Sequence, residues 1–280
     1  MDRKAIARET LEIMRQGYYE VKSGEGDGER CRIDVLEDMK RSVSQSILIT
    51  PEQGEEILKK YGTSVSVCPE SCVENISTVD AIRKLAYEGK GQIGVLNFAS
   101  AKNPGGGFLN GAMAQEESLA ASGTLYRTLT AHEEYYRVNR AHRSMMYTDY
   151  GIYSPEVTFF RDGSFRLVKD PVHASVLTLP AVNMGQVLMK GEDADEAKRV
   201  MRRRMKLALS IFAQQGAKNL VLGAYGCGVF RNDPRQVAVW WREILEEGLG
   251  RYFESVVYAV LDTSRGERCI GAFREELKLE

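Results

Sequence analysis

The sequence predicts an α/β fold with a mostly parallel central sheet, and two observations support this prediction. From about residue 60 onward, short apolar runs typical of buried strands alternate with longer stretches typical of helices. Such an alternation indicates a sheet that is covered by helices. The length of 280 residues also suits one large domain that carries an accessory segment.

The first 60 residues precede this alternation. Apolar residues at mixed helical spacing predict a helix from Asp2 to about Val21, followed by a turn-rich break at 23–30. Short β-rich runs occur at 31–35, 46–50 and 63–67, and a helix from Pro51 to Lys60 precedes the last of them. No linker separates residues 1–60 from residues 61–280. We therefore expect an N-terminal extension that packs on a core domain.

The remaining residues supply the core of the predicted sheet. A helix runs from Thr78 to Gly89, and another opens near Gln115. Buried strands are expected at 92–98, 173–180, 219–224 and 255–262, and further helices at 194–215, from Pro234 onward and at 269–280. The run 158–168 contains Asp162-Gly163 and predicts a hairpin, so we expect a mixed sheet.

The composition excludes several classes of protein. The 38 basic and 39 acidic residues leave a formal net charge of −1, unlike a protein that coats nucleic acid. Hydrophobic residues make up 43% of the chain, which excludes a mainly disordered protein. No run approaches the roughly 20 apolar residues of a membrane span, and the N-terminus lacks the apolar region of a secretory signal. Five scattered cysteines fit a reducing compartment, so we expect a cytoplasmic protein.

Two glycine-rich loops are the first candidates for a binding site. They span 97–118 and 223–234, and each follows a predicted strand and precedes a predicted helix. Glycines at the carboxyl ends of strands let backbone N–H groups approach a phosphate closely. Together the loops predict a diphosphate site, although glycines that only form turns would give the same pattern. The spacing fits neither a P-loop nor the dinucleotide-binding glycine motif.

Gln115-Glu116-Glu117 is the most informative triplet, eight residues after Gly107. Acidic residues are favoured in the first turn of any helix. Beside a glycine-rich loop, however, this pair would also lie next to a bound diphosphate. The helix N-terminus would lower the pKa of such a carboxyl group, whereas its acidic neighbour and the phosphates would raise it. A glutamate that stays protonated near neutral pH would suit a general acid.

Three runs of residues resemble the bacterial-type poly(ADP-ribose) glycohydrolases of the macrodomain superfamily. The run 103–117, NPGGGFLNGAMAQEE, matches their signature of three glycines, a spacer and QEE. The run 223–234 resembles their diphosphate-binding loop, and 97–100 (NFAS) stands where macrodomains have NAAN, with Ser100 replacing the second Asn. The resemblance covers essentially the whole chain. It implies a three-layer α/β/α macrodomain with a mixed central sheet and an N-terminal helical extension, residues 61–280 being the catalytic domain.

The resemblance also implies roles for individual residues. Glu117 would be the catalytic acid and base, and Glu116 would orient the distal ribose through its hydroxyls. Phe230 would pack against that ribose and hold its reacting conformation. The other implied substrate-binding residues come from both loops and from the segment 261–268: Asn97, Asn103, Gly105, Gly106, Gly107, Gln115, Gly226, Cys227, Gly228, Val229 and Thr263.

The implied reaction is hydrolysis of the ribose–ribose O-glycosidic bond of poly(ADP-ribose), from chain ends, with release of ADP-ribose. Glu117 would protonate the departing oxygen and then deprotonate the attacking water, while the diphosphate stabilises an oxocarbenium-like state. We expect no metal or other cofactor, since the three histidines lack metal-ligand spacing and Cys68 and Cys72 lack a second pair.

The implied partners are poly(ADP-ribose) or ADP-ribosylated proteins as substrate and ADP-ribose as product ligand. We expect neither membrane association nor sequence-specific nucleic-acid binding. Two alternatives stay open: a reader macrodomain that binds ADP-ribose without catalysis, and a hydrolase for mono-ADP-ribosylated side chains or ADP-ribose esters. A DNA damage response is suggested by family analogy alone. Arg202-Arg203-Arg204 is interpreted as a solvated helix face.

Overall fold

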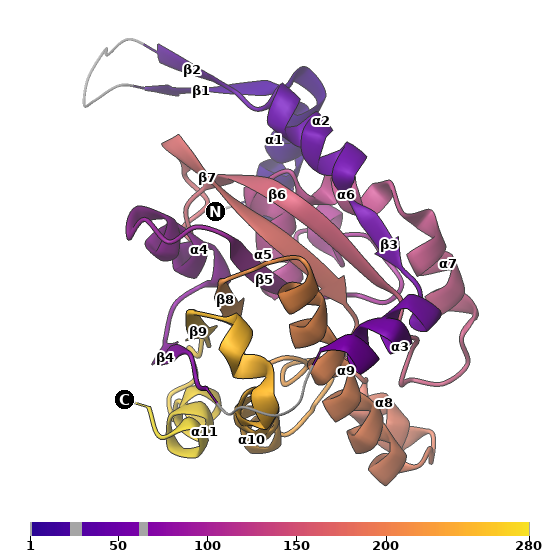
Figure 1. The fold of residues 1–280 in the computed structure, drawn as a ribbon. Coiled ribbons are helices and arrows are strands. Elements are labelled where there is room, and N and C mark those ends of the chain that lie inside the picture. Colours follow the sequence, from indigo (N-terminus) through magenta and orange to yellow (C-terminus); the bar gives the residue numbers. More distant parts are fainter. Residues whose placement is uncertain (1, 23–29, 62–66, 280) are drawn as a thin grey trace.

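The computed structural model describes residues 2–22, 30–61 and 67–279. They form a seven-stranded sheet with helices on both faces, and a two-stranded hairpin that projects from the N-terminal part (Figure 1). The strands are β1 (Tyr18–Lys22), β2 (Arg30–Asp34), β3 (Ile47–Ile49), β4 (Glu70–Glu74), β5 (Ile93–Phe98), β6 (Gly151–Arg161), β7 (Leu167–Leu179), β8 (Asn219–Leu222) and β9 (Ser255–Ala259).

The helices cover both faces of this sheet. They are α1 (Arg3–Gln16), α2 (Leu36–Gln45), α3 (Pro51–Lys60), α4 (Thr78–Tyr87), α5 (Gln115–Ser122), α6 (Leu125–Thr130), α7 (Glu133–Ala141), α8 (Met184–Met189), α9 (Ala194–Gln214), α10 (Pro234–Ile244) and α11 (Arg268–Leu277). Shorter helical segments are η1 (Phe108–Asn110), η2 (Leu245–Leu249) and η3 (Gly250–Tyr252). None of the helices in the described ranges has the length and apolar composition of a membrane span.

The main sheet has the strand order β3-β6-β7-β5-β8-β9-β4. The pairs from β7 to β4 in this order are parallel, whereas β3 pairs with β6 and β6 with β7 in antiparallel fashion. β6 and β7 are the two arms of the hairpin predicted at 158–168, and both continue into the main sheet. The expected three-layer fold with a mixed sheet is confirmed.

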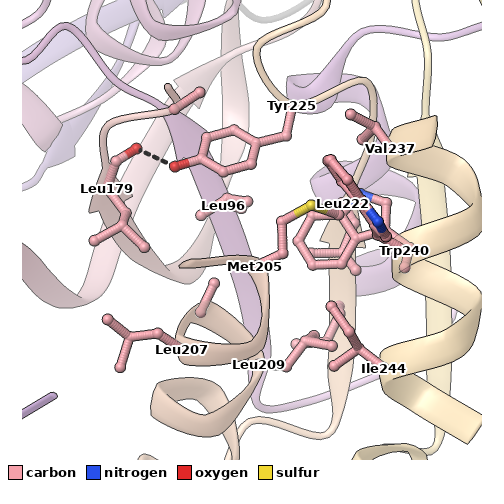
Figure 2. Close-up of a cluster of buried hydrophobic side chains, with 14 of the residues drawn as sticks. Leu96, Leu179, Met205, Leu207, Leu209, Leu222, Tyr225, Val237, Trp240 and Ile244 are labelled. Carbon is pink, nitrogen blue, oxygen red and sulfur yellow. Dashed lines mark hydrogen bonds between the residues drawn. The ribbon is translucent and has the colours of Figure 1, made fainter. Parts of the chain in front are cut away.

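Alternating side chains place a hydrophobic core on each face of the sheet. Along β5, Val95 packs in the core formed with α4, α5, α6 and α7, and Leu96 packs in the core formed with α9 and α10. Figure 2 shows this second core, in which Met205 of α9 and Ile244 of α10 pack with Leu222 of β8. Burial on both faces explains why the central strands appear in the sequence as continuous apolar runs.

The first helix is shorter than the sequence predicts. α1 ends at Gln16 because Gly17 adopts a left-handed conformation (φ 81°) and donates its N–H to the carbonyl oxygen of Ile13. Residues Tyr18–Lys22 then form β1 and pair with β2. Tyr19 is thereby buried, with its ring 5.5 Å from that of Phe160. The prediction of a helix to about Val21 is therefore wrong.

Of the other elements in the N-terminal part, some have the predicted bounds and some are absent from the prediction. α3 has the predicted bounds, because Thr50 and Gln53 form a capping box and Pro51 begins the helix. α2 is not expected from the sequence pattern, and neither is β4, an edge strand in which only Val73 is fully buried. The strand expected at 63–67 and the break at 23–30 lie almost entirely outside the described residues.

Elements from the first 60 residues are attached to the rest of the fold at several points. β3 is the edge strand of the main sheet, paired with β6. In α1, Ile6 and Ala7 pack against Phe108 of η1 and Ala120 of α5. α1 therefore supports the loop that precedes α5 from behind. The division of the chain near residue 60 stays a prediction.

The arginine triplet of α9 is not a solvated face, so that interpretation is wrong. Arg204 is only 1% exposed, and its guanidinium pairs with Asp149. Arg203 pairs with the same aspartate and with Glu55 of α3, and Arg202 pairs with two glutamates near the end of α10, Glu243 and Glu247. These ion pairs connect α9 to α3, to the end of α10 and to the segment that carries Asp149.

Candidate active site

Three loops lie beyond the carboxyl ends of adjacent parallel strands. Residues 99–114 connect β5 to α5 and include η1, residues 223–233 connect β8 to α10, and residues 260–267 connect β9 to α11. Because β5, β8 and β9 are neighbours in the sheet, the three loops emerge at one edge. Ligands of α/β folds bind in this position. Both glycine-rich loops of the sequence therefore border a single candidate site.

Glu116, in the first turn of α5, is a buried carboxyl group. It is 3% exposed, and its Oε2 accepts a hydrogen bond from the N–H of Ser100 at 2.7 Å. Its Oε1 accepts one from the side-chain amide of Asn97 at 3.3 Å. Burial raises the pKa of Glu116 to about 8, and the charge of Glu117 adds to the rise against the opposing effect of these hydrogen bonds. At neutral pH Glu116 therefore holds a proton.

Glu117 lies next to it and is held by the first loop. Its Oε1 accepts the N–H of Gly107 at 2.8 Å, and its Oε2 accepts the N–H of Ala114 at 3.1 Å. Gly106, with φ 59°, lies against both glutamates: a Cβ there would overlap Oε1 of Glu117 and lie 3.1 Å from Oε2 of Glu116. The two carboxyl groups therefore converge on Gly106, where only glycine fits.

The polar residues of the first loop have different surroundings. Asn97 is fully buried, and its amide donates to Thr178 as well as to Glu116, so it links Glu116 to β7. Asn103 is exposed, and its carbonyl oxygen accepts the N–H of Gly106 at 3.0 Å. The hydroxyl of Ser100 in turn accepts the N–H of Asn103 at 3.1 Å. Asn103 is thus the side chain of this set that faces solvent.

Gln115 connects α5 to the sheet. Its side-chain oxygen accepts the N–H of Phe98 at 2.9 Å, and its side-chain nitrogen donates to the carbonyl oxygen of Leu96 at 2.8 Å. β8 pairs with β5 only as far as Val95, so the Gln115 amide satisfies backbone groups of β5 beyond the end of that pairing. The structure thus shows Gln115 holding the glutamate pair in register with β5. Its predicted role in substrate binding stays a prediction.

The second loop is tightly folded at its base and open at its tip. Gly226 has φ 71°, and a Cβ there would lie 2.6 Å from the side-chain nitrogen of Asn232, which donates to the Gly226 carbonyl oxygen. At the tip, a Cβ on Gly228 would meet nothing within 4 Å, and Val229 is 84% exposed.

Backbone N–H groups of this loop are available to a ligand. Within the described residues, the N–H groups of Gly226, Gly228 and Val229 have no backbone acceptor, whereas that of Cys227 donates to Ala224 at 3.1 Å. The amides predicted to bind a diphosphate are therefore free at three of the four positions. Burial raises the pKa of the Cys227 thiol well above its usual value, which disfavours a nucleophilic thiolate.

Phe230 and Thr263 lie at different borders of the site. Phe230 is half-buried, and its ring centroid is 6.0 Å from that of Tyr147. Thr263 is exposed in the third loop. Asp262 orders this loop because its carboxylate accepts N–H groups at the start of α11, and its own N–H donates to Asn75 after β4.

Several residues that shape the site carry no sequence motif. Thr178, Tyr147 and Asn75 come from three segments that are far apart in the sequence, and only the fold brings them to this edge. Across the described ranges, no group of three or more His, Cys, Asp or Glu side chains is arranged to hold a metal ion.

The sequence and the fold were compared with known proteins. Residues 7–162 match the family model described as the catalytic domain of microbial-type PARG. The search of curated proteins gave no match. Among solved structures, poly(ADP-ribose) glycohydrolase from Thermomonospora curvata is similar over 98% of both chains, with 37% identity and a TM-score of 0.91.

Two ligand complexes are also similar to this chain. The Thermomonospora curvata enzyme bound to the inhibitor ADP-HPD matches with 38% identity and a TM-score of 0.88, again over 98% of both chains. Poly(ADP-ribose) glycohydrolase from Deinococcus radiodurans in complex with ADP-ribose has 42% identity and a TM-score of 0.81. That match covers 86% of this chain and 97% of the other.

Proposed function

Because this chain belongs to the microbial-type poly(ADP-ribose) glycohydrolases, we propose that it hydrolyses the ribose–ribose O-glycosidic bonds of poly(ADP-ribose), with Glu117 as the catalytic acid and base. The convergence of Glu116 and Glu117 on Gly106 carries this proposal. Binding of a diphosphate needs N–H donors but no paired acids. Cleavage of a glycosidic bond needs a proton for the departing oxygen and a base for water.

The pair supplies both requirements within one site. Glu116 holds a proton near neutral pH in the free protein, since its pKa is raised to about 8. Both carboxyl groups lie against Gly106, so the proton held by Glu116 is close to Glu117. When the distal ribose binds, its hydroxyls hydrogen-bond to Glu116, and the proton of the pair is carried by Glu117 to the departing oxygen. Glu117 then accepts a proton from the attacking water.

The second loop binds the diphosphate. It carries free N–H groups at Gly226 near its base and at Gly228 and Val229 at its open tip, and such groups stabilise anions without a bulky side chain. Gly105, Gly106 and Gly107 contact the ribose and the diphosphate from the opposite loop, and Asn103 adds a polar contact. Phe230 packs on the distal ribose, and Thr263 lies toward the adenosine. The bound diphosphate supplies the negative charge that stabilises the oxocarbenium-like state.

The experiment is incubation of the purified protein with poly(ADP-ribose), with ester-linked ADP-ribose and with serine-linked ADP-ribose. Release of ADP-ribose from the polymer supports the proposal. Binding without release would favour a reader macrodomain, and turnover of the ester or serine conjugate alone would favour a hydrolase of mono-ADP-ribosylated substrates.

We propose in addition that cleavage starts at chain ends and that residues 1–60 act as an accessory segment to a catalytic domain of residues 61–280. α1 supports this, since it packs against η1 and so restricts access to the first loop from that side. Chromatography of the products made from long polymer tests it: mono-ADP-ribose from the earliest time points is expected, and mainly oligomers would contradict it.

We propose a cytoplasmic setting and a function in the DNA damage response. The five cysteines are unpaired in the described residues, as in proteins of reducing compartments. Cell fractionation and the persistence of polymer after DNA damage in a deletion strain test the two parts separately.

A further inference from the structure

The segment between α7 and β6, residues 142–150, forms no helix or strand but is held by the fold at three points. Asn139 accepts the N–H of Thr148 at 3.0 Å, and Glu192 accepts the N–H of Met145 at 3.1 Å. The third point is Arg204 of α9, which donates to the carbonyl oxygens of Met146 at 2.7 Å and of Tyr147 at 3.4 Å. These attachments fix the position of residues 142–150 relative to the site.

Arg204 is the buried centre of these attachments. Its Nη1 also donates to the carbonyl oxygen of Pro180, just beyond β7, at 3.0 Å, and its Nε donates to Asp149 at 2.8 Å. Burial opposes ionisation of Asp149, but the guanidinium groups of Arg204 and Arg203 lower its pKa overall. The five N–H groups of a planar guanidinium let Arg204 hold three carbonyl oxygens and a carboxylate at once, whereas a lysine has three N–H donors.

Tyr147 is the residue that this network orients. Its backbone has φ 58°, a left-handed conformation that is costly for a residue with a large side chain. Its side chain is almost completely buried, at 8% exposure, and its ring centroid lies 6.0 Å from that of Phe230 at an interplanar angle of 42°. Tilted aromatic pairs at this separation attract each other beyond simple burial. The ordered ring of Tyr147 thus packs beside Phe230, which lies in the second loop.

On the basis of the function proposed above, we propose that Tyr147, fixed by Arg204, is a positioning residue that holds the Phe230 ring in place for the distal ribose. The diphosphate is bound by backbone N–H groups of Gly226, Gly228 and Val229, which Tyr147 does not touch. Loss of the Tyr147 ring therefore impairs the reacting conformation of the sugar more than it impairs binding. A small misplacement of a reacting group lowers a rate strongly even when affinity is retained.

The test compares Tyr147→Leu with Tyr147→Phe. The ring contacts Phe230, so the phenylalanine variant keeps kcat near the wild-type value, whereas the leucine variant loses about tenfold or more in kcat. Its Kd for ADP-ribose changes less than threefold. Tyr19→Leu is the matched control, since it removes another buried tyrosine from an aromatic pair, with Phe160, in the N-terminal part of the fold. It lowers Tm and leaves kcat unchanged.

Crystal structures of the two Tyr147 variants give a readout that does not depend on activity. In Tyr147→Leu the Phe230 ring is displaced, and in Tyr147→Phe it is not. Arg204→Lys, which keeps a charge beside Asp149, displaces Tyr147 and Phe230 together and lowers kcat.

Each opposite result would overturn the proposal. Equal losses in the leucine and phenylalanine variants would assign the effect to the hydroxyl, and an unmoved Phe230 in Tyr147→Leu or in Arg204→Lys would remove the positioning role. Wild-type protein that releases no ADP-ribose would instead contradict the proposed function, and the crystal structures would still decide whether Tyr147 positions Phe230.

Discussion

The backbone N–H of Gly107 donates a hydrogen bond of 2.8 Å to Oε1 of Glu117. Together with the N–H of Ala114, it orients the carboxyl group without a side-chain partner. We expect Glu117→Gln to keep one of these two hydrogen bonds through its amide oxygen but to lose proton transfer. General acid–base catalysis contributes about 10²- to 10⁴-fold, so turnover of polymer falls by that factor while ADP-ribose still binds.

Glu133 provides a matched control for this variant. It is an exposed glutamate in the first turn of another helix, α7, with no hydrogen bond, among the described residues, to any of the three loops. Glu133→Gln is expected to retain full activity. Steady-state kinetics and calorimetric titration with ADP-ribose check both variants, and full turnover by Glu117→Gln would refute the assigned mechanism.

Gly106→Ala is expected to abolish activity by displacing the acid pair. The alanine Cβ would overlap Oε1 of Glu117, and the residue would also retain a strained φ of 59°. Gly216→Ala separates the two effects, because Gly216 has φ 75° but a methyl group added there would meet nothing within 4 Å. Both variants lose about 1 kcal/mol of stability through strain. Activity assays and thermal unfolding should show a large loss of turnover in Gly106→Ala alone.

The buried Glu116 makes stability depend on pH. Its pKa is raised from an ordinary value of 4.5 to about 8, so the folded state binds more protons than the unfolded state between these values. Stability therefore falls as pH rises from about 4.5 to 8 and changes little from this group above it. Glu116→Gln removes the ionisation and is expected to be more stable than wild type by on the order of 1–4 kcal/mol at pH 8.5.

Denaturant unfolding at pH 5 and pH 8.5 checks this expectation. At pH 5 the two proteins should differ little, because Glu116 is protonated in the folded state there. A stability difference that is the same at both pH values would contradict the raised pKa.

The raised pKa of Glu116 also predicts that the enzyme loses activity at alkaline pH. Glu116 must carry its proton into the complex with substrate, and it loses that proton as pH rises through about 8. We expect kcat/KM for polymer to fall tenfold for each further pH unit above this value. A pH–rate profile measures it, and a profile that stays flat to pH 10 would exclude the pair as the proton source.

Local signals in the sequence predict the sheet and both glycine-rich loops. β5 and β8 are continuous apolar runs because both faces are covered, and α3 has its cap residues Thr50 and Gln53 adjacent to it. β4 escapes prediction, since an edge strand with glutamates at both ends has little apolar pattern. The end of α1 depends on Gly17, whose left-handed conformation is one of several that glycine can adopt.

The candidate site likewise contains residues that the sequence reveals and residues that only the fold reveals. The acid pair and the glycines are recognisable because they are close together in the sequence. Arg204 is not, because its role depends on carbonyl oxygens more than 20 residues away, at Met146, Tyr147 and Pro180. Its position within a run of three arginines suggests a solvated face, and only the packing of α9 against those loops shows the opposite.

Arg161→Met is expected to loosen α1 from the core and thereby weaken the support behind the first loop. The Arg161 side chain is 3% exposed and donates to Glu9 of α1 at 2.7 Å and to the carbonyl oxygen of Phe165 at 3.0 Å. Methionine fills the apolar part of this space but leaves the Phe165 carbonyl oxygen without its partner, which costs about 1–3 kcal/mol.

Arg166→Met is the matched control for Arg161→Met, since Arg166 lies in the same hairpin but is 76% exposed and pairs with Asp162 at the surface. Exposed pairs of this kind contribute about 0–1 kcal/mol. Denaturant unfolding should give similar free energies of unfolding for wild type and Arg166→Met, and a lower one for Arg161→Met. Limited proteolysis should cut α1 first in Arg161→Met, with a parallel loss of turnover because Phe108 of η1 loses its contacts with Ile6 and Ala7. Equal stability of the two variants would mean that the remaining contacts, including the hydrogen bond from the Thr10 hydroxyl to the carbonyl oxygen of Ala121, hold α1 in place without Arg161.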